Sequence, residues 1–404
     1  MKIVVLKFGG SSVGSIQRIK NVAKIVISYL KNRYKVIVVS SAMVGETNKL
    51  VKLTKQTSNN FTPSEYDSIV STGEQVSCSL IAGRLNDQGY LARSWLGWQV
   101  PIFTIGNYSN SRITKINKKN IINFLKKGGV PIITGFQGIN SENRITTIGR
   151  GGSDASAIMI AKFFKAKKCI IYTDVDGIYS TDPNVIPKAK KIKKISYEEM
   201  LEMASTGAKV MQPHSIQDAR LNRIDVEVRS SFKNASGSLI TKRKNISTKN
   251  IIRGVSFTKN DAKVTLVGVK DKPGVAASIF EPLFKNSVNV DMVVQNISSN
   301  KKETDLTFTI KNDDLLKTNK LIKKNKNIKF KKIIIDQKVS KISIVGVGMI
   351  TTPGVTFRMF NALAKKNINI LVISTSEIKI SVLIHQRNLK KAVDVLHKEF
   401  KLDY

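Results

Sequence analysis

Apolar residues recur along the first 245 residues in two alternating rhythms. Short runs rich in Val and Ile predict buried strands at 2–6, 35–40, 130–136 and 168–175. Between these runs, apolar residues repeat at helical spacing, at 15–31, 70–87 and 153–165. This alternation predicts an α/β fold, in which a mainly parallel sheet lies between helical layers. Ligands of such sheets bind where loops leave the carboxyl ends of the strands.

The C-terminal part of the chain contains an internal repeat, in which 262–298 resembles 340–376. Val-Gly-Val and Pro-Gly-Val recur in both copies, and Phe280 and Leu283 recur as Phe360 and Leu363. Each copy reads strand, Pro-Gly turn, helix and strand, followed by further strands. This order predicts two ferredoxin-like βαββαβ units.

A polar, turn-rich stretch at 240–250 separates the repeat from the first part. A chain of 404 residues is also too long for one ordinary core. We therefore expect three domains, at 1–245, 250–335 and 336–404.

The net charge of +38 would ordinarily indicate a polyanionic partner. The lysines are spread over the whole chain among Asn and Ile, and no zinc finger or ribonucleoprotein signature is present. Compositional bias and anionic substrates are the favoured explanation, and nucleic-acid binding is the less favoured one.

The two cysteines, Cys78 and Cys169, are isolated and lack metal-ligand spacing. The apolar runs are shorter than the ~18 residues of a membrane span. The first residues also lack the pattern of a signal peptide. We expect a cytoplasmic protein without disulfides, zinc or a membrane anchor.

The first candidate for chemistry is "LKFGGSSV" at 6–13. Lys7 at the end of a strand, followed by Gly9 and Gly10, offers a cation beside exposed backbone N–H groups. This is an anion cradle but not a Walker loop, since G-x-x-x-x-G-K-[ST] is absent. A plain strand-to-helix turn with an incidental lysine is the alternative.

The second candidate is "GRGGSD" at 149–154. Arg150 can hold a carboxylate or a phosphate through two hydrogen bonds. The two glycines after it allow close approach of the backbone to a ligand. Capping of the helix that follows is the alternative role for Ser153 or Asp154, but capping does not explain the Arg-Gly-Gly before it.

Polar side chains also occur at three other places. The segment 172–183 follows a strand and is dense in hydroxyls and carboxylates, 40–48 supplies Ser41 and Thr47 after a strand, and Glu74 lies on an otherwise apolar helix. Turn geometry or a solvated charge would explain each of these singly. Together the loops favour phosphoryl transfer, which depends on positioning and neutralisation of charge. The three histidines, His214, His385 and His397, lie far from these loops in sequence, so we expect no Ser-His-Asp set.

In this order, "KFGGSSV", "STGEQ", "FQGIN", "TTIGRGGSDASA", "YTDVDGIYSTDP" and "ISYEEMLEMASTGAKVM" resemble the aspartate kinases of the amino-acid-kinase superfamily, and the repeat resembles their paired ACT domains. The resemblance implies the amino-acid-kinase fold and ATP-dependent phosphorylation of the aspartate β-carboxylate. That reaction opens the biosynthesis of lysine, threonine, methionine and diaminopimelate. It also implies Mg²⁺ carried on the ATP phosphates, without a dedicated protein metal site.

The resemblance also implies residue roles. Lys7 and Asp154 would be catalytic, with Lys7 neutralising the transferring phosphoryl group and Asp154 ordering the cationic groups. ATP would be bound by Lys7, Phe8, Gly9, Gly10, Thr173, Asp174, Tyr179, Asn184, Lys209 and Val210. Aspartate would be bound by Ser41, Thr47, Glu74, Phe136, Arg150 and Ser153. Asn184 departs from the arginine of some family members, which puts that nucleotide contact in doubt.

For the tail, the resemblance implies lysine and/or threonine as feedback inhibitors. Their contacts would be Asp271, Gly274, Ala276, Gln295, Val355, Thr356, Asn369, Ile370 and Glu377. It implies a homodimer, or a larger assembly with a separate tail-only subunit. Two other interpretations stay open: another amino-acid kinase, and a basic nucleic-acid-binding protein on a disused kinase frame.

Overall fold

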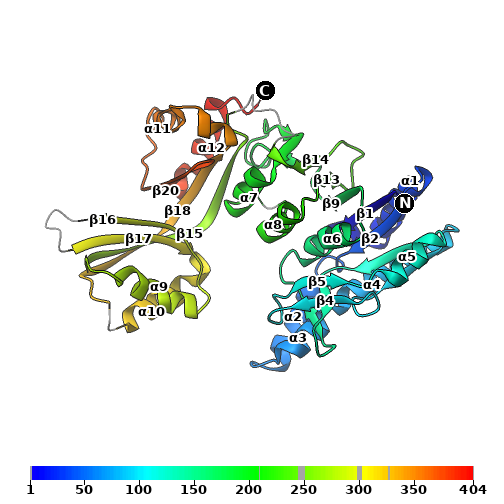
Figure 1. Cartoon of the computed structure of the whole chain (residues 1–404). Helices are drawn as coiled ribbons and strands as arrows, with labels where there is room; N and C mark the ends of the chain where they lie inside the picture. The colour runs from blue at the N-terminus through cyan, green and yellow to red at the C-terminus, as the bar shows by residue number, and fades with distance from the viewer. Residues whose placement is uncertain (1, 209, 244–250, 298–302, 326–327, 404) are drawn as a thin grey trace. The chain divides into compact units, whose positions relative to one another are not determined.

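The computed structural model describes residues 2–208, 210–243, 251–297, 303–325 and 328–403 (Figure 1). The chain divides into two compact units. The first comprises 1–178, 191–205 and 209–247. The second comprises 179–190, 206–208 and 248–404.

The first unit is built on an eight-stranded sheet that is parallel at every pairing described except that of β13 with β14. Its strands, in spatial order, are β12 (Lys194–Ser196), β14 (Ser238–Thr241), β13 (Val226–Ser230), β9 (Lys168–Thr173), β1 (Ile3–Phe8), β2 (Lys35–Ser40), β6 (Val130–Thr134) and β3 (Ala92–Trp95). The central strands are buried along almost their whole length, as a sheet covered on both faces requires.

Helices lie on both faces of this sheet (Figure 1). The helices of the first unit are α1 (Ile16–Lys31), α2 (Glu46–Thr57), α3 (Pro63–Val70), α4 (Thr72–Asp87), α5 (Lys119–Lys126), α6 (Gly152–Phe163), α7 (Tyr197–Ser205) and α8 (Pro213–Asn222). Ser15 caps α1 by accepting a hydrogen bond from the backbone N–H of Arg18, and the buried side chains of α1 recur at helical spacing.

Side chains alternate between the two faces along β1, and this places its one lysine. Val4, Leu6 and Phe8 pack in a core with residues of α1 and α4. Lys7 therefore points to the opposite face, where α6 packs on β1, β2 and β9.

A smaller four-stranded sheet lies beside the main one and consists of β5 (Arg112–Ile116), β4 (Ile102–Ile105), β7 (Gln137–Ile139) and β8 (Ile145–Thr147). The hairpin of β7 and β8 connects β6 to α6, so it delivers the chain to "GRGGSD". A separate two-stranded ribbon is formed by β10 (Ile178–Tyr179) and β11 (Lys191–Ile192).

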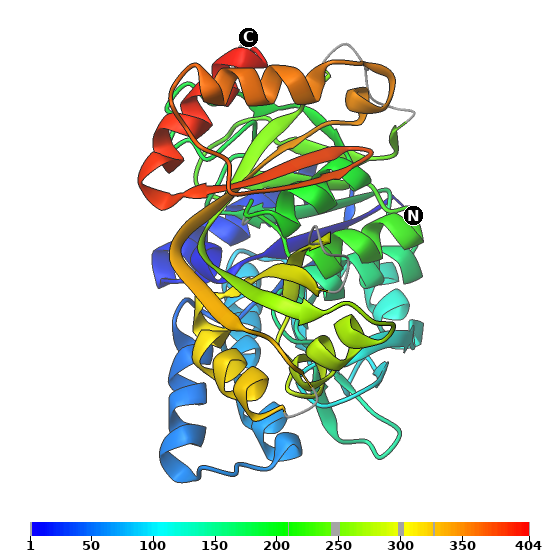
Figure 2. The same cartoon turned by 90° about the vertical axis from the view of Figure 1, so that its left-hand side faces the viewer.

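The second unit contains one antiparallel six-stranded sheet. Its order is β16 (Val290–Ile297), β17 (Glu303–Lys311), β15 (Gly254–Lys270), β18 (Lys332–Val345), β20 (Lys379–His385) and β19 (Val372–Ser376). Its helices are α9 (Val275–Lys285), α10 (Leu315–Lys324), α11 (Val355–Ala364) and α12 (Leu389–Glu399). Figure 2 shows β15 and β18 running the length of this sheet, with α9 and α10 at one end and α11 and α12 at the other.

The two repeats share these long strands. The second half of β15 pairs with β17 in the first repeat, whereas Gly254–Thr258 at its start pairs with Lys341–Val345 of β18. Ile252 and Val255 accordingly belong to the core of the second repeat. The ranges 250–335 and 336–404 did not anticipate this, because a repeat read linearly assigns every strand to the copy in which it occurs.

Candidate active site

Lys7 and Asp154 form a buried ion pair at the carboxyl end of the sheet. Lys7 Nζ lies 2.6 Å from Asp154 Oδ1, and each side chain is 10% exposed. Lys7 is the penultimate residue of β1, and Asp154 lies in the first turn of α6, where the helix dipole favours a carboxylate. The two glycine-rich loops singled out in the sequence thus meet through a direct contact.

The loop after Lys7 places backbone close to this ammonium group. A methyl group on Gly9 would lie 3.3 Å from Lys7 Nζ, so the amine rests against the Gly9 backbone. Gly9 N–H donates to Tyr172 O at the end of β9, and a methyl group on Gly10 would lie 3.0 Å from Ala42 O. The loop therefore fits between the chain segments that follow β9 and β2.

The "GRGGSD" loop turns sharply into α6. Gly151 precedes the helix with φ +73°, a conformation that favours glycine, and no side chain caps this end. Neither Ser153 nor Asp154 therefore caps the N-terminus of α6. The side chain of Arg150 is exposed and forms no hydrogen bond or ion pair with the part of the chain that the structure describes.

Glu74 has a buried carboxylate, and one of its two oxygens has no hydrogen-bond partner among the described residues. It lies in the first turn of α4, and Oε1 accepts from the backbone N–H of Ala42 at 3.0 Å. Oε2 is buried and has no hydrogen-bond partner among the described residues. Burial raises the pKa of the Glu74 carboxyl to about 7, opposed by the hydrogen bond from Ala42. A buried, half-satisfied carboxylate is suited to a cationic partner.

The other expected aspartate-binding residues lie on the same edge of the sheet. Ser41 follows β2, and its N–H donates to Phe8 O. Phe136 follows β6 with φ +68°, an unfavourable conformation for a bulky residue that often marks functional sites. Ser153 packs directly against Gly135, and the half-buried Thr47 lies in the first turn of α2. The structure thus gathers these residues around the ends of β1, β2 and β6, apart from the Arg150 side chain, which points to solvent.

The expected nucleotide-binding residues divide between the two units. Thr173 ends β9, and its hydroxyl donates to the exposed Asp174 at 3.1 Å. Phe8 is fully buried and stacks on Tyr172. Tyr179 and the exposed Asn184 belong to the second unit, whereas the half-buried Val210 belongs to the first. Lys209 lies outside the described residues.

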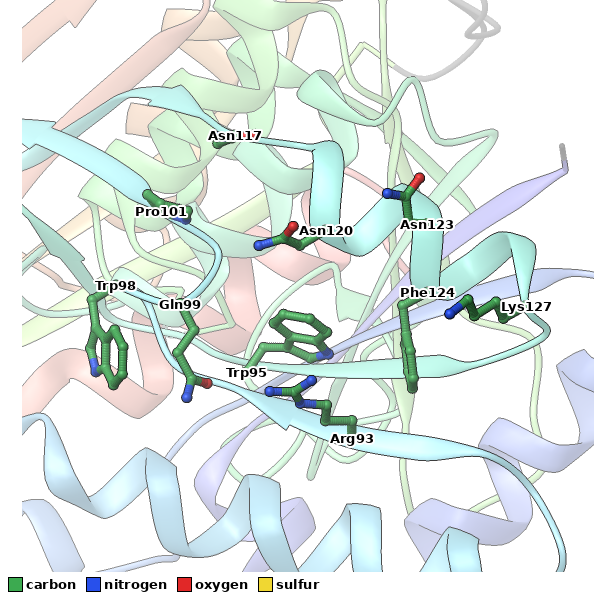
Figure 3. Close-up of a pocket in the computed structure, with 10 residues that line it drawn as sticks. All are labelled: Arg93, Trp95, Trp98, Gln99, Pro101, Asn117, Asn120, Asn123, Phe124 and Lys127. Carbon is green, nitrogen blue, oxygen red and sulfur yellow. The ribbon is translucent and has the colours of Figure 1, made fainter.

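A separate hollow of about 700 Å³ in the first unit contains none of the expected site residues (Figure 3). Residues of β3, α5 and the loops beside them line it, with Trp95 and Phe124 in edge contact. Across the residues that the structure describes, no group of three or more His, Cys, Asp or Glu is placed to hold a metal ion. In the same residues, no helix is long and apolar enough to cross a membrane.

Comparison with known proteins agrees with this geometry. Residues 2–230 match the model of the amino acid kinase family, and 264–325 with 342–400 match an ACT domain model. The aspartate kinase of Pseudomonas putida is 45% identical over 405 residues, covering 100% of this chain and 98% of that protein. Aspartokinase 2 of Bacillus subtilis is 40% identical over 403 residues, again covering 100% and 98%. The chain belongs to the aspartate kinase family.

The solved structures lead to the same family. Escherichia coli aspartokinase III in complex with aspartate and ADP has a TM-score of 0.82 at 25% identity, covering 98% of this chain and 99% of that one. The same enzyme with lysine and aspartate has a TM-score of 0.81 at 25% identity, covering 99% and 100%. The expectations of a kinase, of the amino-acid-kinase fold and of C-terminal ACT domains are confirmed.

The expected effector residues of the second unit lie in loops, in the first turns of α9 and α11, and in β16. Gly274 and Gly354 occupy matching places before α9 and α11, with φ +86° and +85°. Val355 is buried, whereas Asp271, Gln295, Thr356, Asn369 and Glu377 are exposed, and Ala276 and Ile370 are half-buried. Their matching positions follow from the repeat, and their role as effector contacts stays a prediction.

The expectation of no Ser-His-Asp set needs correction. Ser180 Oγ lies 2.9 Å from His397 Nε2, and His397 Nδ1 lies 3.3 Å from Asp403 Oδ1. Distance along the sequence hid this, because the segment 179–190 packs with α12 in the second unit. The Ser180 hydroxyl also accepts from Lys190 N–H, and the residue is 2% exposed, so we assign the set a structural role.

Sequence reasoning also missed two buried polar residues of the first unit. Asp67 in α3 is 0% exposed and accepts four hydrogen bonds. Ser231, just after β13, donates from its hydroxyl to Ser12 Oγ at 2.8 Å. The available signal for Asp67 was a carboxylate three residues before Val70 on the buried face of its helix, and nothing in the sequence marked Ser231.

Proposed function

We propose that the chain transfers the γ-phosphoryl group of ATP to the β-carboxylate of L-aspartate, giving 4-phospho-L-aspartate and ADP. The observation that carries this proposal is the Lys7–Asp154 pair resting against Gly9 at the carboxyl end of the sheet. Escherichia coli aspartokinase III, which shares the fold over nearly the whole chain, has been solved with aspartate and ADP.

The reaction brings two anions together, so electrostatic stabilisation is its main requirement. The Lys7 ammonium group supplies a fixed positive charge beside the Gly9 backbone, where a phosphate oxygen is to be held. Asp154 holds that ammonium group in place. The aspartate β-carboxylate is ionised at neutral pH and needs no general base. We therefore assign Asp154 the positioning of Lys7 rather than proton abstraction.

The aspartate half of the site recognises the amino and carboxylate groups separately. Glu74 Oε2, buried and unpartnered among the described residues, is the acceptor for the substrate ammonium. Arg150, exposed and without a described partner, is free to hold a substrate carboxylate through two hydrogen bonds. Ser41, Thr47, Phe136 and Ser153 complete the pocket.

The nucleotide is assigned to Lys7, Phe8, Gly9, Gly10, Thr173, Asp174, Tyr179, Asn184, Lys209 and Val210. Mg²⁺ would add positive charge to the phosphates of ATP. The donor set fits a cation held mainly by those phosphates, because Asp154 is engaged by Lys7 and the exposed Asp174 is the carboxylate left at the end of β9.

The ACT units at 250–335 and 336–404 are assigned to feedback inhibition by lysine and/or threonine. The start of β15 pairs with β18 of the second repeat, as described above. Support comes from Escherichia coli aspartokinase III, which has been solved with lysine in a T-state. We further propose that the chain forms a homodimer or a larger assembly through these units, in the reducing cytoplasm.

Hydroxamate formation tests the proposal directly. The purified chain is incubated with ATP, Mg²⁺, hydroxylamine and L-aspartate, and the acyl phosphate is trapped as the hydroxamate. We expect product with aspartate and little with L-glutamate as the matched acceptor. Product with glutamate but not with aspartate would indicate a different amino-acid kinase. Adding lysine and threonine, singly and together, tests the regulation, which a flat response would exclude.

A further inference from the structure

Asp67 is a fully buried carboxylate held by four hydrogen bonds. Its Oδ2 accepts from Ser109 N–H at 2.9 Å and from Thr147 N–H at 2.6 Å. Its Oδ1 accepts from Ser109 Oγ at 2.7 Å and from Thr147 Oγ1 at 2.9 Å. None of the described residues forms a salt bridge with it. Four hydrogen-bond donors offset the free-energy cost of burying the carboxylate, and they also fix its position.

The donors belong to segments that lead directly to the arginine loop. Thr147 ends β8, three residues before Arg150. Ser109 lies in the left-handed region, with φ +61°, and a methyl group on Gly149 would lie 2.8 Å from its carbonyl oxygen. Ser111 N–H also donates to Thr147 O at 3.0 Å. Asp67 thus holds both chain segments that set where "GRGGSD" begins.

The other end of the arrangement is the helix pair that carries Glu74. The helix α3, which contains Asp67, continues through Ser71 into α4, and Glu74 lies in the first turn of α4. Gln137, the residue after Phe136, donates from Nε2 to Ser71 O at 2.8 Å. Asp67 and Gln137 therefore fix the junction of α3 and α4 on the hairpin of β7 and β8.

We propose that Asp67 is a positioning residue for aspartate binding: its carboxylate sets the Arg150 loop at a fixed distance from Glu74. The inference rests on the proposed function, since it takes these two side chains as the contacts for the substrate carboxylate and ammonium groups. A substrate with two opposite charges a few ångströms apart is sensitive to that distance. The Lys7 loop lies on other strands and is not held by these bonds.

The test measures KM for aspartate and for ATP, kcat, and the midpoint of thermal unfolding in matched variants. Asp67→Asn keeps the shape and replaces one acceptor oxygen with a donor. We expect KM for aspartate to rise at least ~10-fold, with KM for ATP within about twofold of the wild type. Glu65→Gln on the same helix is the control: it breaks the exposed pair with Arg144, and we expect both constants to stay unchanged.

A second pair of variants keeps the test decisive if Asp67→Asn does not fold. Thr147→Val removes one hydroxyl donor without changing shape, and Thr147→Ser restores the hydroxyl. We expect Thr147→Val to raise KM for aspartate roughly 3-fold or more, and Thr147→Ser to recover most of it.

Equal rises in both KM values, or a lower unfolding midpoint with normal KM values, would show a purely structural role and overturn the inference. Failure of the wild type to form the aspartyl hydroxamate would instead overturn the proposed function. The two failures are therefore distinguishable.

Discussion

The ammonium group of Lys7 and the carboxylate of Asp154 lie 2.6 Å apart, although the two residues are 147 positions apart in sequence. The contact is possible because Lys7 points away from the core formed with α1 and α4, toward the face that α6 covers. Removing one member of such a pair leaves the other buried without its counter-charge. The pair therefore acts as one unit, and each half depends on the other.

We expect Lys7→Ala and Asp154→Ala each to lower kcat at least ~10²-fold, because a fixed charge at the transferring phosphoryl group is lost or displaced. Because the two residues act as a unit, the double variant should be little worse than either single one. Lys168→Ala, an exposed lysine at the start of β9, is the matched control. Near-normal turnover in either single variant would count against the assignment.

Arg150→Ala should raise KM for aspartate far more than KM for ATP, since the guanidinium is assigned to the acceptor substrate alone. The side chain is exposed and has no described partner, so the unfolding midpoint should not change. Arg150→Lys should recover only part of the affinity, because lysine cannot form the paired hydrogen bonds of a guanidinium. A larger effect on ATP than on aspartate would reassign the loop to the nucleotide.

Glu74 should make aspartate binding dependent on pH near neutrality. The pKa of its carboxyl is raised by burial to about 7, and only the ionised form attracts the substrate ammonium. We expect kcat/KM for aspartate to fall about tenfold per pH unit below pH 7 and to level off above it. Glu74→Gln should lower kcat/KM and abolish this break, whereas a break retained in the variant would belong to another group.

The raised pKa of Glu74 also affects stability. Whereas kcat/KM rises with pH, the contribution of Glu74 to the free energy of unfolding falls as pH rises. Between pH 4.5 and 7 the folded state binds a proton that the unfolded state has released, so this stabilising contribution is lost as pH rises through 7. The 2.5-unit difference corresponds to about 3 kcal/mol above that pH. Glu74→Gln should therefore unfold at a higher temperature than the wild type, by a margin that grows from pH 5 to about pH 7 and levels off above it.

Much of the fold, and the choice of candidate site residues, followed from local signals. Apolar runs and helical spacing predicted β1, β2, β6, β9, α1, α4 and α6, because the spacing of buried side chains can be recognised within each segment alone. Lys7 and "GRGGSD" stood out because each joins a charge to glycines before a helix, and Glu74 because it is a charge on an otherwise apolar helix. The positive φ of Gly151 and the absent cap agree with that interpretation.

What the sequence did not predict depends on contacts between distant segments. The hydrogen bonds of Asp67 could not be predicted, because they form only where α3 packs against Ser109 and Thr147 in the fold. The strand Gly254–Thr258 joins the second repeat through pairing with β18, which no local period reveals. Likewise, Ser180 and His397 are 217 residues apart and meet because the segment 179–190 packs with the ACT units.

That last contact carries a prediction for the second unit. His397 is 1% exposed, and desolvation by burial lowers its pKa, opposed by Asp403 and Asp394. The folded state thus holds the neutral ring while the unfolded state takes up a proton below about pH 6.5. The contribution of His397 is present above that pH and is lost as pH falls toward the lowered folded value. His397→Gln should flatten the decline in the unfolding midpoint between pH 7 and pH 5.

The same variant tests whether the segment 179–190 serves the nucleotide. Tyr179 and Asn184 lie on it, and Asn184 borders a hollow of about 360 Å³ with His397 and Asp403. The Ser180–His397 bond and the hydrogen bond from Lys190 N–H to Ser180 Oγ hold both ends of the segment against α12. We expect Ser180→Ala and His397→Gln at pH 8 to raise KM for ATP about 3-fold or more and to leave KM for aspartate near normal. An unchanged KM for ATP in both variants, measured where they remain folded, would remove this segment from the nucleotide site.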